Sequence, residues 1–176
     1  MDLESNNWFF VYEKRNFLLA EDVVKTMKRA SQTLGMKVED PYWVELKDFN
    51  NPADLTENIE YYRKQTGRLP SIAVIMIGNE RQYKGYKKAA YDSNIVSQCM
   101  LFKTVSKLNL SVFSNVLRQI NSKIGGDLYN INFSKEINPR TMLIGIDVCH
   151  QGQSSIVGFC ASINKDMSQY YSEKIL

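Results

Sequence analysis

Apolar positions divide the first half of the chain into short continuous runs and longer stretches in which they recur every three or four residues. The runs predict β-strands, and the recurring spacing predicts amphipathic helices. In chain order these are a strand over residues 8–12, a helix over 18–34, a strand over 42–49 and a helix that begins at Asn51-Pro52. Glycines follow both helices as stop signals.

The strongest strand prediction is the continuously apolar run SIAVIMI at residues 71–77. A strand that is apolar on both sides is typical of the centre of a parallel sheet. A helix over 81–92, a strand over 96–102 and a helix over 111–124 come after it. Strands that alternate with helices predict an α/β fold, a Rossmann-like and mostly parallel sheet with helices on both faces. Binding sites of such sheets lie at the carboxyl ends of the strands, here the loops after Ile77 and Phe102.

A domain boundary is expected near Asn138-Pro139, which gives domains over residues 1–138 and 139–176. After it, strand-like runs at 142–149 and 155–163 are separated by the polar residues 150–153, which predicts a hairpin. Two strands and a short remainder are too little for an independent domain. The second part is therefore expected to be a piece of a larger one.

Composition adds little to this picture. With 44% hydrophobic and 23% charged residues, the chain is typical of a globular protein, and a net charge of +3 does not by itself identify a nucleic-acid binder. Three cysteines without paired spacing do not predict disulfides or a zinc site. The polar N-terminus lacks a secretory signal, and no apolar run is long enough for a membrane span. We expect an intracellular protein, in the cytoplasm or the nucleus.

Tyr83 and Lys87 are four residues apart and therefore share one face of their predicted helix. A phenol, an ammonium group and the free amides of a helix start can together bind a phosphate, and the tyrosine ring can stack on a base. The alternative is a solvated basic helix face with Tyr86 packed inward.

Three further polar residues are candidates for the same site. Gln119 and Lys123 have the same spacing of four beside the apolar stripe of their helix, and the alternative is a plain surface pair. Gln98 lies in a strand of mixed character, where its side chain points either into a cleft or into solvent.

Asp147 is the one carboxylate in the apolar run MLIGIDV. An acid in such a strand is usually paired or binds a metal, and in ribonuclease-H-type nucleases a strand aspartate holds magnesium. The alternative is an aspartate that caps a turn at a strand end. The chain has neither a Gly-rich phosphate loop nor a nucleophile-elbow serine.

Four blocks of this sequence, in one order, resemble those of Piwi-type Argonautes. They are YKGYKK at 83–88, SQC at 97–99, QINSKIGG at 119–126 and GIDVCH at 145–150. The opening WFFVYEKRN at 8–16 is similar to the first strand of the Piwi Mid domain, and residues 155–172 are similar to the second PIWI strand and the segment after it. The resemblance implies a Mid domain followed by a truncated, ribonuclease-H-like PIWI start.

The resemblance also implies roles for these residues. Tyr83, Lys87, Gln98 and Lys123 would contact the 5′-phosphate and first nucleotide of a small, piRNA-like guide RNA. Gln119 is similar to the Piwi branch, which lacks a lysine there, and the missing cation favours a Mg²⁺ ion beside the phosphate. In the family that ion also uses the protein's C-terminal carboxylate, so the site would be incomplete here.

Asp147 matches the first acid of the family's slicing tetrad and would bind metal only in a complete PIWI domain. The remaining tetrad residues are expected beyond Leu176, and His150 is not among them. This fragment is therefore predicted to be inactive, whereas a full-length parent could be a guide-directed RNA endonuclease.

The sequence thus predicts a guide-RNA-binding module of RNA silencing, a monomer that would meet target RNA through its guide. Two alternatives stay open: an active ribonuclease-H-like nuclease fragment and a small-ligand-binding α/β domain.

Overall fold

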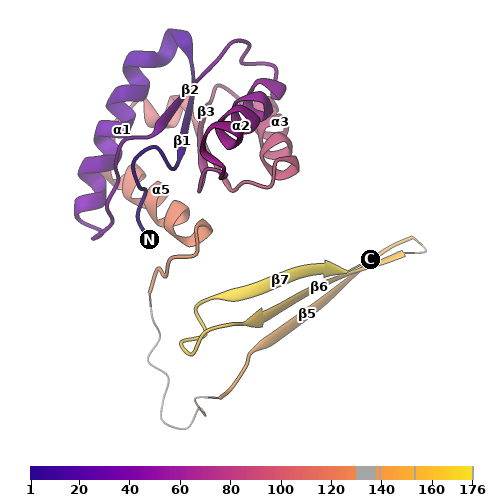
Figure 1. Cartoon of the computed structure of the whole chain (residues 1–176). Helices are drawn as coiled ribbons and strands as arrows, with labels where there is room; N and C mark the ends of the chain where they lie inside the picture. The colour runs from indigo at the N-terminus through magenta and orange to yellow at the C-terminus, as the bar shows by residue number, and fades with distance from the viewer. Residues whose placement is uncertain (130–137, 139, 153, 176) are drawn as a thin grey trace. The chain divides into compact units, whose positions relative to one another are not determined.

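The computed structural model describes residues 1–129, 138, 140–152 and 154–175 (Figure 1). These form two compact units, Met1–Gly126 and Asp127–Leu176. Pro139 lies outside the described residues, so the boundary expected at Asn138-Pro139 stays a prediction. The described part contains no helix of the length and apolarity that a membrane span requires.

The first unit is built on a four-stranded sheet in the order β2-β1-β3-β4, and every neighbouring pair is parallel. Its strands are β1 (Phe9–Glu13), β2 (Tyr42–Leu46), β3 (Ala73–Ile77) and β4 (Ser97–Leu101). All five residues of β3 are buried, and the strand lies between β1 and β4. The run SIAVIMI therefore supplies an interior strand, as its continuous apolarity predicted.

Helices cover both faces of this sheet (Figure 1). They are α1 (Phe17–Gln32), α2 (Ala53–Thr66), α3 (Glu80–Asp92) and α5 (Leu110–Lys123). The apolar stripes of α1 and α5 pack on one face and those of α2 and α3 on the other. The α/β fold with a parallel sheet and helices on both faces is thus confirmed.

Two predicted strands end earlier than expected. The strand predicted over 42–49 stops at Leu46, because the buried Asp54 carboxylate accepts hydrogen bonds from the amides of Lys47 and Asp48 at 3.0 and 2.9 Å. These amides therefore bind a side chain in the first turn of α2 instead of extending the sheet. Phe102 likewise leaves β4 and begins the short helix α4 (Phe102–Val105). The 3₁₀ turn η1 (Lys14–Asn16) was not predicted either.

The second unit is an antiparallel sheet in the order β5-β6-β7. Its strands are β5 (Ile144–Gln151), β6 (Ser154–Ser162) and β7 (Tyr170–Ile175). The predicted hairpin is present, but its strands reach into the expected turn, so that His150 and Gln151 belong to β5. Gln153 lies outside the described residues. The third strand, β7, was not predicted.

The interior position of β3 has a measurable consequence. Ile75 is fully buried against both neighbouring strands, and truncation to alanine should cost about 2–5 kcal/mol of unfolding free energy. The control Leu18→Ala removes an equally large side chain that is 76% exposed, and should change stability by less than about 0.5 kcal/mol. Equal losses for Ile75→Ala and Leu18→Ala in chemical denaturation would contradict this placement of the core.

Candidate functional site

Helix α3 presents Tyr83 and Lys87 on one face, as their spacing predicted. Asn79 caps the helix by accepting a hydrogen bond from the amide of Gln82 at 3.1 Å. The Lys87 Nζ lies 5.7 Å from the centroid of the Tyr83 ring, which is within cation–π range. Tyr86 is fully buried, as the alternative interpretation of this helix expected, but Lys87 is not simply solvated.

Lys87 and Lys123 converge on Ser97, the first residue of β4. The Lys87 Nζ donates to the Ser97 carbonyl oxygen at 2.7 Å and contacts the Ser97 hydroxyl at 3.0 Å. The Lys123 Nζ, from the end of α5, donates to the same carbonyl oxygen at 3.1 Å. Because β4 is an edge strand, this carbonyl is free to accept hydrogen bonds from side chains.

Gln98 and Gln119 extend the same network. The Gln98 Oε1 accepts a hydrogen bond from Lys123 at 2.7 Å, and its Nε2 donates to the Gln119 Oε1 at 3.0 Å. Its Nε2 also lies 3.2 Å from the Cys99 carbonyl oxygen. Gln98 is 7% exposed, so its polar groups are satisfied inside the cluster and serve to hold Lys123 and Gln119.

The five predicted residues therefore form one connected cluster, but its place differs from the prediction. The Tyr83 end lies near the carboxyl ends of β3 and β4, where Tyr83 lines a cavity together with Ile77 and Leu101. The lysine end lies at Ser97, at the amino end of β4. The expectation of a site at the carboxyl ends of the strands is thus wrong for the two lysines. Their ammonium groups contact the outer edge of β4 at its first residue.

The same cluster borders a mostly apolar cavity of about 270 Å³. Tyr83, Gln98 and Gln119 line it on the polar side. Its other lining residues come from β3, β4, α4 and α5 and are mainly apolar, among them Ile77, Cys99, Met100, Val105, Val112 and Val116. A flat apolar group beside the cation pair could enter this space.

The cluster contains two positively charged side chains, Lys87 and Lys123. Within the described residues neither Lys87 nor Lys123 forms an ion pair. Although Lys123 is exposed overall, loss of solvent around its ammonium group lowers its pKa, and the positive charge of Lys87 lowers it further. Burial raises the pKa of the Cys99 thiol, an effect that the two lysines oppose.

The structure explains why two positions in the sequence blocks are glycine. A Cβ atom on Gly85 would lie 2.7 Å from the Pro52 side chain, so glycine lets α3 approach the start of α2. Gly125 has φ +91°, which favours glycine and turns the chain directly after α5. Lys123 is therefore held in the last turn of its helix, beside β4.

Ser97 is the member of the cluster that the sequence did not single out. It contributes mainly through its backbone carbonyl, which any residue possesses, so its residue type carries no signal. Its position before Gln98 in the SQC block was the available hint.

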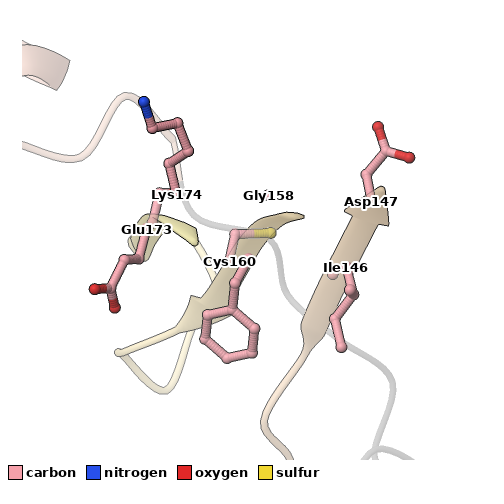
Figure 2. A pocket seen from close by; sticks show the side chains of 9 residues that line it. Ile146, Asp147, Gly158, Cys160, Glu173 and Lys174 are labelled. Carbon is pink, nitrogen blue, oxygen red and sulfur yellow. The ribbon is translucent and has the colours of Figure 1, made fainter. Parts of the chain in front are cut away.

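Asp147 belongs to the second unit, where it lies on strand β5 (Figure 2). It is exposed, and its Oδ1 accepts a hydrogen bond from the Val148 amide at 3.0 Å. The described residues include no group of three histidine, cysteine or acidic side chains able to hold a metal, at Asp147 or at Gln119. His150 contacts the Ser155 hydroxyl at 2.8 Å.

Comparison with solved structures identifies the fold. The crystal structure of Drosophila Piwi matches 97% of this chain with a TM-score of 0.76 at 18% identity, and the chain covers 24% of it. The Mid domain of Arabidopsis thaliana AGO5 matches 71% of this chain with a TM-score of 0.56 at 23% identity, over 91% of that domain. The fold is that of Argonaute proteins.

Sequence comparison then gives the family. The Piwi domain family matches residues 71–175, more than half of the chain, and the chain belongs to this family. Piwi-like protein 1 of Danio rerio is 26% identical over 179 residues, and that of Gallus gallus is 27% identical. Both alignments cover 97% of this chain and 20% of the relative, so the chain spans about a fifth of these curated relatives.

The charge coupling within the cluster can be measured. Lys87→Met should raise the pKa of Lys123 toward the ordinary lysine value, because a neighbouring positive charge that disfavours protonation is removed. The Lys123 pKa should stay below the ordinary value, since its burial remains. NMR titration of the Lys123 ammonium group measures this, with Lys84→Met on the exposed face of α3 as the control. An unchanged Lys123 pKa in Lys87→Met would show that the two charges are not coupled.

Proposed function

We propose that this chain binds the 5′-phosphate end of a small guide RNA, as the Mid portion of a Piwi-type Argonaute that acts in RNA silencing. The observation that carries the proposal is the pair Lys87 and Lys123, which share the Ser97 carbonyl and have no carboxylate partner among the described residues. A terminal phosphate carries nearly two negative charges and several acceptor oxygens, and would replace that carbonyl as their partner.

The surroundings of the lysine pair suit a nucleotide better than a free anion. The half-exposed Tyr83 ring can stack on a base, and the apolar cavity beside it gives a flat ring room to enter. The Gln119 side chain lines the same cavity, and its neutral amide group can donate a hydrogen bond to the ligand. Phosphate recognition and base stacking would then come from adjacent parts of one cluster.

Solved structures of this fold support a guide RNA as the ligand. The Argonaute of Kluyveromyces polysporus, which matches 98% of this chain with a TM-score of 0.72, was solved with a guide RNA. The Argonaute of Marinitoga piezophila, with a TM-score of 0.62, was solved with a 5′-hydroxyl guide RNA. The fold thus occurs with a guide that lacks the phosphate, and the choice between the two ends must come from side chains. Two uncompensated lysines favour the phosphate.

Binding of one RNA with either a 5′-phosphate or a 5′-hydroxyl tests the proposal. Each lysine contact to the phosphate should be worth roughly 1.5–3 kcal/mol, so Lys87→Ala or Lys123→Ala should weaken binding of the phosphorylated RNA about ten-fold or more. The same substitutions should affect the hydroxyl RNA much less, because the contact is absent there.

The matched control is Lys14→Ala. Lys14 is 84% exposed in its side chain and faces Glu45 of β2, on the opposite edge of the sheet from β4. If Lys14→Ala weakens binding as much as Lys87→Ala, the affinity is diffuse electrostatics. Equal affinity of the unmodified chain for the two RNA ends would contradict the proposal directly.

Cleavage is a separate question, and we expect none from this chain. Metal-assisted phosphodiester cleavage uses several carboxylates, and the described residues offer no acidic cluster at Asp147. Incubation of the purified chain with guide, matching target RNA and Mg²⁺ should leave the target intact. Guide-directed cleavage that disappears in Asp147→Asn would show that the active-nuclease alternative is correct.

A further inference from the structure

The turn from β3 into α3 is held by one side chain, that of Gln82. Asn79 begins the helix, and its Oδ1 accepts a hydrogen bond from the Gln82 amide at 3.1 Å. In the other direction, the Gln82 Oε1 accepts a hydrogen bond from the Gly78 amide at 2.8 Å. This reciprocal pair resembles a capping box, in which the second side chain usually reaches the cap residue itself. Here it reaches one residue further back, into the end of β3.

The other end of the same side chain contacts a different segment of the chain. The Gln82 Nε2 donates to the Phe49 carbonyl oxygen at 3.4 Å and to the Asn50 Oδ1 at 3.3 Å. Phe49 and Asn50 belong to the connection between β2 and α2, 33 and 32 residues before Gln82. Capping of α3 does not require these contacts. Gln82 therefore joins two loops in addition to starting its own helix.

The connection between β2 and α2 supports α3 at further points. The Phe49 carbonyl oxygen also accepts a hydrogen bond from the hydroxyl of the fully buried Tyr86 at 2.9 Å. Pro52 packs against the helix so closely that a Cβ atom on Gly85 would lie 2.7 Å from its side chain. The first turns of α3 are thus fixed against this connection, and Gln82 extends the contact to the turn that precedes the helix.

Tyr83 follows Gln82 directly, and its place depends on how α3 begins. Among the residues that the structure describes, no hydrogen bond holds the Tyr83 hydroxyl, and the ring lies 5.7 Å from the Lys87 ammonium group. Its ring is half-exposed and borders the cavity of about 270 Å³. The backbone at the start of α3 therefore determines where this ring stands.

We propose that Gln82 is the positioning residue for Tyr83. By joining the turn after β3 to the connection between β2 and α2, it fixes the start of α3, so that the tyrosine ring is placed to stack on the first base of a bound RNA. This role rests on the proposed function and adds to it a residue outside the lysine cluster. A group that is fixed before binding loses less conformational freedom on binding, and the complex is tighter for that reason. Gln82 acts here through Tyr83 and not through a contact of its own with the ligand.

The first test needs no RNA. Gln82→Met keeps the length of the side chain and removes both of its polar ends. Hydrogen exchange of the Gly78 amide should become about three-fold faster or more, because this amide loses its acceptor. The matched control is Gln65→Met, the same change at an exposed position on α2, which should leave that exchange rate unchanged. An unchanged Gly78 exchange rate in Gln82→Met would overturn the role of Gln82.

The second test separates positioning from general stability. Two 5′-phosphorylated RNAs are compared, one complete and one that lacks the base of its first nucleotide. Gln82→Met should weaken binding of the complete RNA about three-fold or more and leave binding of the abasic RNA nearly unchanged, because only the complete RNA can stack on Tyr83. In a Tyr83→Ala background, Gln82→Met should have no further effect on either RNA.

The outcomes distinguish this role from the proposed function. An unmodified chain that does not prefer a 5′-phosphate over a 5′-hydroxyl would contradict both. If that preference is present, an equal effect of Gln82→Met on the complete and the abasic RNA would overturn only the positioning role. An effect of Gln82→Met that persists in the Tyr83→Ala background would do the same.

Discussion

Two like charges share one backbone oxygen in this protein, and the candidate site depends on that contact. The Nζ atoms of Lys87 and Lys123 lie 2.7 and 3.1 Å from the Ser97 carbonyl oxygen, so they are at most about 6 Å apart and repel each other. Hydrogen bonds to an edge strand and to the Gln98 amide offset part of this repulsion. The arrangement is best satisfied when an anion joins it, because a phosphate attracts both ammonium groups at once.

The parallel sheet makes this contact available. Helix α3 precedes β4 and helix α5 follows it, and β4 lies at the edge of the sheet, where its outward carbonyls accept hydrogen bonds from side chains instead of from a further strand. The buried stripes of α3 and α5 pack on opposite faces, through residues such as Tyr86 and Phe113. The lysine of each helix can therefore reach the same edge from its own side. Displacement of the Ser97 carbonyl from this edge would leave the two ammonium groups without their common partner.

Sequence periodicity predicted the first unit well because its elements bury regular apolar faces. The run SIAVIMI and the stripes of α1 and α5 carry that signal, and each corresponds to an observed element. Strand β7 was missed because every residue of it is exposed in this chain, so the pattern holds no buried face. Strand β2 ends at Leu46 because the next amides bind Asp54, and β4 ends before Phe102 because that residue begins α4. Hydrophobic spacing encodes neither event.

The site was predicted through its side chains and not through its backbone. Spacing placed Tyr83 with Lys87, and resemblance joined them to Gln98, Gln119 and Lys123, which the structure connects. The role of Ser97 rests mainly on a carbonyl that every residue has, and the amino-end position of the lysines depends on which strand forms the edge. The order of the strands in a sheet depends on contacts between residues far apart in the sequence, and no local pattern determines it.

The most direct measurement follows the ammonium NMR signals of Lys87 and Lys123 during titration with uridine 5′-monophosphate and, separately, with uridine. An anion that joins the pair should shift both signals together and raise the pKa of Lys123, which starts below the ordinary lysine value. Uridine should do neither, since it carries no charge. Equal shifts with both ligands, or a Lys123 pKa that the monophosphate leaves unchanged, would contradict the account of this cluster as a phosphate site.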